Sequence, residues 1–136
     1  MEVFIFKNKK YYNNTKFALE LKDSQIENAG IGLFTKEKIK KNRLIGYYGG
    51  ELLKVKNENY DPDYSIEINN RYVIDGSKYP RPFTSMMNDA HKSKFSNNCE
   101  FIVDLAKKRV EMRATRIINE GEELFIDYGE EYWETR

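Results

Sequence analysis

The sequence predicts a mainly β domain built from many short strands. Its apolar residues come mostly in short runs separated by turn residues, a pattern typical of short strands rather than long helices. Within residues 110–115, Val110, Met112 and Ala114 alternate with charged or polar side chains, as in a strand with one buried face. A chain of 136 residues fits one domain with one modest core, so no second catalytic module is expected.

The other strands are expected, in chain order, where apolar residues alternate or gather between turns. Residues 17–21 alternate before a turn at 27–30, and the next strand passes through Leu33 and Phe34. The remaining strands are predicted at 44–48, 64–68, 72–74 and 124–128, with 64–68 and 72–74 joined as a hairpin around Asn69-Asn70 and a turn at 119–121 before the last strand. The polar segment 55–63 predicts a surface loop, and residues 130–136 could form one marginal helical turn.

Composition argues against several classes of partner. The chain has 23 basic and 22 acidic residues, so no direct nucleic-acid partner is expected, and the local excess in residues 1–16 predicts a basic N-terminal arm or first strand. No stretch reaches the ~20 apolar residues that span a bilayer, so we expect no membrane partner and an intracellular protein. Cys99 is the single cysteine, so neither an internal disulfide nor a cysteine-rich zinc site is expected, and no metal is predicted.

The supply of catalytic side chains argues against a hydrolase. There is one histidine and one cysteine, and neither a Gly-x-Ser-x-Gly nor a Walker-type loop is present. His91 has no second ligand or partner nearby in the sequence, so it is predicted as a surface loop residue rather than a catalytic base.

An ordered series of short motifs does point to a function. The series is Gly30-Ile31-Gly32, Tyr48-Gly49-Gly50-Glu51, Asn88, and the block Gly-Glu-Glu-Leu-Phe-Ile-Asp-Tyr-Gly at 121–129. The glycine pair alone is weak, because an ordinary turn has the same pattern, but the block is specific. In this order the motifs resemble the SET-domain family of protein-lysine methyltransferases over residues 17–133. The final Tyr-Gly-Glu-Glu-Tyr-Trp is similar to the minimal SET proteins of large DNA viruses.

The resemblance implies a β-clip-like SET fold of several short sheets and short helices, with a C-terminal pseudoknot in which the motif strand threads beneath a preceding loop. The SET domain would occupy residues 17–129, and residues 130–136 would be a short aromatic, post-SET-like tail without zinc. Because the family's cysteine-rich post-SET segment is absent, Tyr132 and Trp133 are expected to close the site; plain anchoring of the tail is the alternative.

The resemblance also implies the reaction, methyl transfer from S-adenosylmethionine to a lysine side chain. Such a transfer needs a neutral amine held in line and a pocket for a positive methyl donor, which oxygen acceptors and aromatic faces suit. Tyr128 matches the family's catalytic tyrosine, and Tyr64 matches a position that often lines the lysine channel, with an ordinary strand residue as the alternative. Ile126 and Tyr132 are expected in the same channel.

Ile126 stands where the family usually carries Phe or Tyr and where side-chain bulk and hydroxyls govern the number of methyl groups added. A tyrosine hydroxyl there could hold a water in the space of a further methyl, whereas Ile126 has no such group. The implied outcome is methylation beyond the first step.

The resemblance implies the cofactor-binding residues, which are Gly30, Ile31, Gly32, Tyr48, Asn88, Asp89, Tyr128 and Trp133. Asn88 matches the first residue of the family's Asn-His-Ser stretch, which binds the amino-acid end of the cofactor. Here Asp89 and Ala90 follow it, then an extra loop at 92–96, and Ser85 stands where Arg is usual. These departures keep open a non-catalytic, SET-like binding module.

By resemblance, the leading substrate is a histone tail, and a non-histone host or viral protein is the alternative. A histone substrate would place the protein in the nucleus of a host or eukaryotic cell, and association with a virion is the other location that the viral resemblance implies. A homodimer is compatible with the viral relatives, although no sequence feature indicates one.

Overall fold

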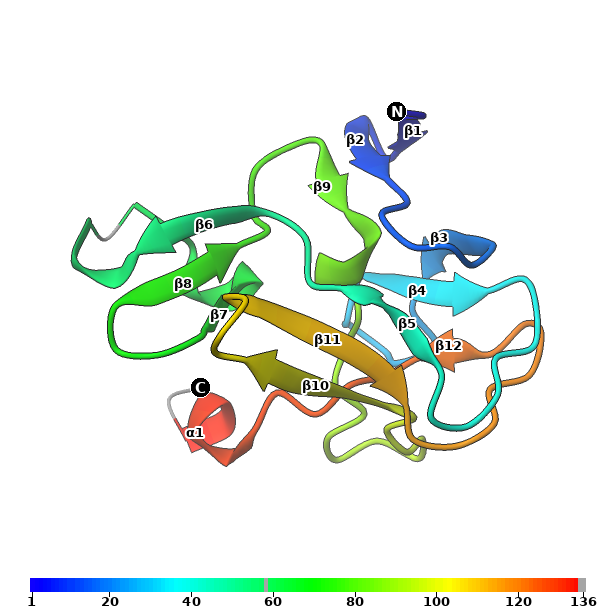
Figure 1. The fold of residues 1–136 in the computed structure, drawn as a ribbon. Coiled ribbons are helices and arrows are strands. Elements are labelled where there is room, and N and C mark those ends of the chain that lie inside the picture. The colour runs from blue at the N-terminus through cyan, green and yellow to red at the C-terminus, as the bar shows by residue number, and fades with distance from the viewer. Residues whose placement is uncertain (58, 135–136) are drawn as a thin grey trace.

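The computed structural model describes residues 1–57 and 59–134, and its regular structure is mostly strand, which confirms a mainly β fold (Figure 1). The strands are β1 (Phe4–Phe6), β2 (Lys9–Tyr12), β3 (Leu19–Asp23), β4 (Ile31–Thr35), β5 (Leu44–Tyr47), β6 (Glu51–Lys54), β7 (Ser65–Glu67), β8 (Tyr72–Asp75), β9 (Arg81–Pro82), β10 (Cys99–Asp104), β11 (Arg109–Ala114) and β12 (Glu123–Leu124). The helical elements are η1 (Val55–Asn57), η2 (Pro62–Tyr64), η3 (Phe83–Ser85) and α1 (Glu130–Glu134).

The strands form small three-stranded sheets, in the orders β1-β2-β9, β12-β4-β3, β10-β11-β5 and β6-β8-β7. In the view of Figure 1 the β6-β8-β7 sheet lies at the left and the β12-β4-β3 sheet at the right, with the β10-β11-β5 sheet between them. Helix α1 lies below β10, at the opposite end of the molecule from the N-terminal hairpin.

Most of the predicted strands are present. In β11, Val110, Met112 and Ala114 are buried and their neighbours are less so, which confirms the predicted alternation. Strand β3 begins two residues later than expected, and Tyr64 ends η2 instead of starting a strand. The hairpin of β7 and β8 and the helical turn at 130–134 are confirmed, while residues 135 and 136 lie outside the described residues.

The N-terminal segment folds back onto the domain. Strands β1 and β2 pair antiparallel, and β2 pairs parallel with β9, through Tyr11 with Arg81 and Tyr12 with Pro82. The Tyr11 side chain is 1% exposed, so the hairpin is packed into the core. It therefore becomes one wall of the cavity described below.

The segment after β12 lies between two earlier parts of the chain. The main-chain N–H of Ile126 donates to the carbonyl of Asn88 at 2.9 Å, and the N–H of Cys99 donates to the carbonyl of Phe125 at 3.0 Å. Isolated parallel bridges join Asn88 with Phe125 and Cys99 with Ile126. These bonds on both sides hold the following residue pair, Asp127 and Tyr128, against the segment around Asn88.

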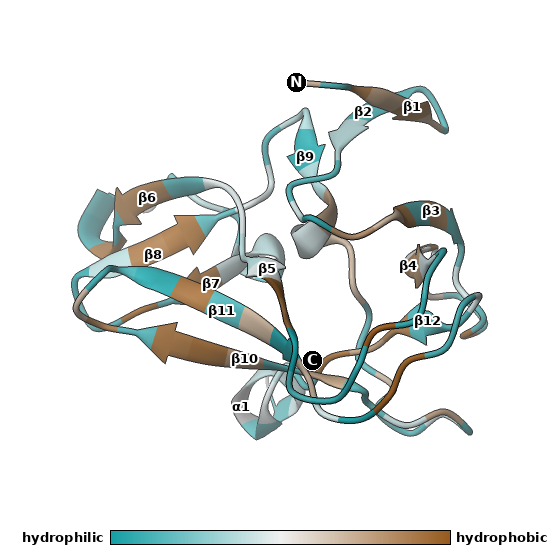
Figure 2. Cartoon of the chain, turned by 45° about the vertical axis from the view of Figure 1, so that its right-hand side comes forward, coloured by the Kyte–Doolittle hydropathy of each residue, from teal (hydrophilic) through white to brown (hydrophobic). Residues whose placement is uncertain are grey.

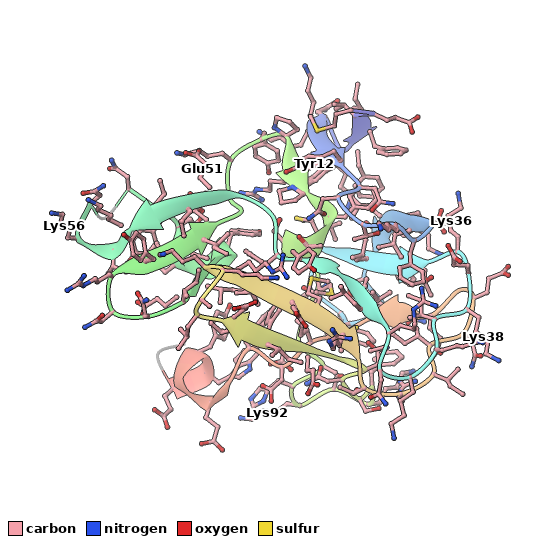
Figure 3. The ribbon with its side chains drawn as sticks, in the orientation of Figure 1. Tyr12, Lys36, Lys38, Glu51, Lys56 and Lys92 are labelled. Atoms are coloured by element: carbon pink, nitrogen blue, oxygen red, sulfur yellow. The ribbon has the colours of Figure 1, made fainter. Side chains whose placement is uncertain are left out.

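The apolar core runs under the central sheets. Leu33, Ile39, Ile118, Leu124 and Ile126 are all fully buried in one cluster. The brown, hydrophobic stretches of Figure 2 follow strands such as β8 and β10. Figure 3 shows Lys36, Lys38 and Lys56 projecting outward, and all three are exposed. Among the described residues, no helix is long and apolar enough to cross a membrane.

Candidate active site

Two cavities meet at Tyr128. The first is lined by Gly30, Ile31, Asn88, Asp89 and Trp133, among others, and the second by Tyr48, Ser65, Glu67 and Phe101, among others. The residues that line both cavities are Asp63, Ser85, Met87, Tyr128 and Tyr132. Two molecules entering from different sides could therefore face each other at the Tyr128 side chain.

Tyr128 is held at this junction by its main chain and its hydroxyl. The Tyr128 N–H donates to Asp89 Oδ2 at 2.9 Å, and the phenol donates to the main-chain carbonyl of Met87. Burial raises the pKa of Tyr128 far above its ordinary value, and the neighbouring Tyr132 and Asp89 add to this shift. The phenol is therefore protonated at neutral pH, with oxygen lone pairs that can still accept a bond.

Tyr48 and Tyr64 line different cavities. Tyr48, expected at the cofactor, lines the second cavity, and Tyr64, expected in the lysine channel, lines the first. The two are linked, because the Tyr48 hydroxyl donates to the main-chain carbonyl of Tyr64 at 2.6 Å. Burial raises the pKa of Tyr48, so this donor also keeps its proton.

Gly32 does not line either cavity, and its role is to admit a buried carboxylate. A Cβ at Gly32 would lie 2.3 Å from Glu123 Oε2, closer than any real contact. Glu123, 1% exposed, accepts hydrogen bonds from Ser24 Oγ at 2.7 Å and from the Gln25 N–H at 2.8 Å. The carboxylate thus fixes the turn that leads to Gly30, a role that the motif around Glu123 did not reveal.

Asn88 holds the same turn from the other side. Its Nδ2 donates to the Ile31 carbonyl at 2.9 Å, while its Oδ1 makes no hydrogen bond to any of the described residues. Because Asn88 lines the first cavity, this free oxygen is available to a donor such as an ammonium group.

Asp89 is the residue whose side chain the sequence analysis underrated. It is 8% exposed, and Oδ2 accepts from the Tyr128 N–H and from Trp133 Nε1, both at 2.9 Å. Its Oδ1 accepts from the His91 N–H at 3.0 Å and from Asn97 Nδ2 at 3.1 Å. The carboxylate therefore joins the extra loop, the end of the motif block and the tail.

The tail brings an aromatic cluster to the first cavity. The ring of Tyr132 lies edge-on to that of Tyr128 at 4.7 Å between centroids, and Trp133 stacks on His91 at 4.3 Å and 12°. Both tail residues line the first cavity, as expected of residues that close it. His91 is exposed as predicted, although it also supports Trp133.

Arg81, which the sequence analysis did not select, is a cation in the wall of the first cavity. Its guanidinium lies between the rings of Tyr64 and Tyr79, at 4.0 and 4.3 Å from their centroids, and Nε donates to the Ser77 carbonyl at 2.6 Å. Neither Nη atom has a hydrogen bond among the residues that the structure describes. Ser85, where the family has Arg, instead donates to the Pro82 carbonyl at 2.8 Å.

Ile126 does not line either cavity. It is 0% exposed and belongs to the core cluster against which Tyr128 packs. Any influence of Ile126 on a bound amine would therefore act through the packing of this core cluster.

The first cavity fits the cofactor that the sequence implies. Trp133 and Tyr132 supply aromatic rings suited to an adenine, and Arg81 and the Asn88 amide oxygen, which line the same cavity, suit a carboxylate and an ammonium. Gly30 lines the cavity and has a φ of +77°, a conformation that favours glycine. No group of three or more potential metal ligands occurs within residues 1–57 and 59–134.

Comparison with known proteins points to one family. A SET-domain family model matches residues 30–129. The chain is 29% identical over 107 residues to Histone-lysine N-methyltransferase MEDEA of Arabidopsis thaliana, covering 73% of this chain and 15% of that protein. It is 34% identical over 115 residues to Histone-lysine N-methyltransferase CLF of Oryza sativa subsp. japonica, covering 74% of this chain and 12% of that protein. It is also 34% identical over 115 residues to Histone-lysine N-methyltransferase EZ1 of Zea mays, covering 74% of this chain and 11% of that protein. The chain thus spans less than a sixth of the length of these relatives.

Proposed function

The chain belongs to the SET-domain family, and on this premise we propose that it is a protein-lysine N-methyltransferase that uses S-adenosylmethionine. The observation that carries the proposal is the junction at Tyr128, where a cavity suited to the cofactor meets a second cavity open to a substrate. When bound, the cofactor supplies a methyl group on a positively charged sulfonium.

In this proposal the first cavity binds and orients the cofactor. Trp133 and Tyr132 would stack against or cover the adenine, and Asn88 and Arg81 would hold the amino-acid end. The main chain around Gly30 and Ile31 would lie against the same end. The buried Tyr48 and the half-buried Tyr128 at the junction would limit the access of water to the reacting atoms.

Tyr128 would position the target amine. Because its phenol proton is committed to the Met87 carbonyl, the oxygen presents a lone pair to an amine N–H. That bond would turn the nitrogen lone pair away from the hydroxyl and toward the cofactor side, which is the in-line placement the transfer requires. Tyr48 keeps the opposite wall rigid through its bond to the Tyr64 carbonyl.

The substrate is proposed to be a lysine on an extended peptide, with a histone tail as the leading candidate. Strand β7 is the edge of the β6-β8-β7 sheet, and Ser65 and Glu67 of β7 line the second cavity, so a peptide could add to this edge as a further strand. The acidic side chains of Asp63 and Glu67 at that cavity suit a cationic lysine. The names of the relatives support a histone as the substrate, and a histone substrate would place the protein in a nucleus.

We also propose that transfer goes beyond one methyl group. Ile126 has no hydroxyl with which to hold a water in the space of a second methyl. Because Ile126 lies in the core cluster against which Tyr128 packs, the effect would come from local packing and from the missing hydroxyl rather than from direct contact with the amine.

The test is incubation of the purified protein with labelled S-adenosylmethionine, a panel of histones and a cell lysate, followed by mass spectrometry. The proposal expects label on lysine that is lost in Tyr128→Phe, and the labelled protein names the substrate. Calorimetric titration with the cofactor is run in parallel. Absence of both transfer and cofactor binding would favour the alternative, a non-catalytic SET-like binding module.

A further inference from the structure

We propose that Asp89 is a positioning residue whose carboxylate fastens the tail helix α1 over the first cavity, and that binding in this cavity depends on that fastening. The identity of the ligand rests on the proposed function, but the fastening itself does not. The Asp89 carboxylate bonds three separate segments, at His91 in the loop, Tyr128 at the end of the motif block and Trp133 in the tail.

The hydrogen bonds require a carboxylate at this position. Each oxygen of Asp89 accepts two N–H groups, from Tyr128 and Trp133 on Oδ2 and from His91 and Asn97 on Oδ1. A carboxylate is a pure acceptor with about four lone-pair directions, and all of them are used. An asparagine would turn its own NH₂ group toward two donors, so it would lose two of these bonds and oppose their N–H groups.

The tail needs such a fastening. Helix α1 spans five residues, Glu130–Glu134, and a helix this short has little stability of its own. Its attachments include the Trp133 Nε1 bond to Asp89, the stacking of Trp133 on His91 and the ring contacts with Tyr128. Figure 3 shows Lys92, which follows His91, beside this helix. Since Asp89 also bonds the main chain of His91, it orients both sides of the stacked pair.

The same carboxylate couples the tail to the reacting end of the site. One oxygen, Oδ2, receives both the Trp133 indole and the main-chain N–H of Tyr128. A change at Asp89 should therefore act in two ways: it loosens the Trp133 wall of the first cavity and shifts Tyr128 at the junction. The first effect appears in cofactor affinity, and the second in the rate of the bound enzyme.

The first test uses fluorescence, because Trp133 is the one tryptophan of the sequence. Asp89→Asn should shift the emission maximum of the native protein to longer wavelength, as the indole loses its acceptor and gains water. The control is Asp127→Asn, which changes a neighbouring exposed carboxylate that accepts from the Gly129 N–H and, among the described residues, makes no hydrogen bond to Trp133. It should leave the emission unchanged. An Asp89→Asn protein that is folded by circular dichroism and has the wild-type emission overturns the proposal.

The second test measures the dissociation constant of S-adenosylmethionine by calorimetry. Asp89→Asn and Trp133→Phe should each weaken binding by about tenfold, the size expected for loss of a charge-assisted hydrogen bond. In the double variant the fold-loss of affinity should be well below the product of the two single-variant losses, because Asp89 acts through Trp133. If the losses of affinity in the two single variants multiply in the double variant, Asp89 does not act through Trp133 and the proposal is overturned. Restoring affinity by Asp89→Glu would support it.

The outcomes separate this proposal from the proposed function. A wild-type protein that binds no S-adenosylmethionine, together with a red-shifted Asp89→Asn variant, would contradict the function and leave the fastening intact. If Asp89→Asn does not fold, Trp133→Phe removes a single donor at the surface and tests the same bond through the dissociation constant. Unchanged affinity in that folded variant, in a wild type that binds the cofactor, overturns the dependence.

Discussion

The hydroxyl of Tyr128 donates a hydrogen bond to the main-chain carbonyl of Met87, forty-one residues earlier in the chain. Met87 precedes Asn88, whose carbonyl accepts the N–H of Ile126, so the two segments are joined both before and at the tyrosine. The phenol oxygen is therefore set by main-chain atoms of the cavity wall rather than by a mobile side chain. This geometry is the basis of the first prediction.

Replacement of Tyr128 by Phe should reduce methyl transfer by about a hundredfold or more while leaving cofactor affinity within about twofold. The hydroxyl positions the amine, whereas the ring remains to line both cavities. Single-turnover transfer measured by mass spectrometry, with the affinity from calorimetry, checks this. The matched control is Tyr12→Phe, at a tyrosine of β2 that lines neither cavity (Figure 3). Wild-type transfer by Tyr128→Phe would remove Tyr128 from the mechanism.

Gly32→Ala should lower the free energy of unfolding by about 1–3 kcal/mol, because the new Cβ collides with the buried Glu123 carboxylate. Chemical denaturation measures this loss. A cycle with Glu123→Ala isolates the cause: once the carboxylate is gone, Gly32→Ala should cost much less. An equal cost in both backgrounds would locate the strain in the backbone instead.

The sequence predicts strands well where one face is buried and poorly where pairing alone makes the strand. Strand β11 was found because Val110, Met112 and Ala114 alternate with polar neighbours. Strand β10 was not predicted, because its adjacent residues Ile102 and Val103 are both 40% exposed and its sequence shows no alternation of apolar and polar residues. The two-residue β9 forms only because the N-terminal hairpin reaches it, and such a pairing has no local signal.

The candidate site, like the fold, contains residues that the sequence predicts and residues that it does not. Motif spacing led to Asn88, Tyr128 and the glycine turn, which do meet at the first cavity. It did not reveal that Tyr48 and Tyr64 line different cavities, since this depends on how segments distant in the sequence pack together. Arg81 was missed because a single arginine in the two-residue strand β9 has no sequence pattern, and its importance comes from the two rings that hold it.

Stability should fall at alkaline pH partly because of Cys99. Burial raises the pKa of its thiol from an ordinary 9.0 to about 12, so the native state keeps a proton that the unfolded chain releases. The stabilisation is complete below pH 9 and is lost as pH rises toward 12, by up to roughly 1.4 kcal/mol per pH unit. Chemical denaturation across this range should show that the free energy of unfolding falls less steeply with pH in Cys99→Ala than in the wild type. Identical slopes would mean that the thiol ionises normally in the folded protein.

The number of methyl groups should respond to a hydroxyl at position 126. Ile126→Tyr should shift the product toward monomethyl-lysine, because a held water would occupy the space of the next methyl. Ile126→Phe has nearly the same bulk without the hydroxyl, and so it measures the packing cost at this fully buried position. Mass spectrometry at matched total transfer gives the product ratio. Equal ratios in the two variants would attribute any change to bulk alone.

Arg81 should contribute affinity through the carboxylate of the cofactor. Its guanidinium is fixed between Tyr64 and Tyr79, and its Nη atoms are left for a ligand by the described residues. Arg81→Met keeps the length of the side chain and removes the charge, and should weaken S-adenosylmethionine binding by about tenfold or more. The matched probe is decarboxylated S-adenosylmethionine, which lacks the group that Arg81 would hold. Calorimetry should give the same affinity for this probe in wild type and variant; an equal loss for both ligands would show that Arg81 shapes the cavity without binding the carboxylate.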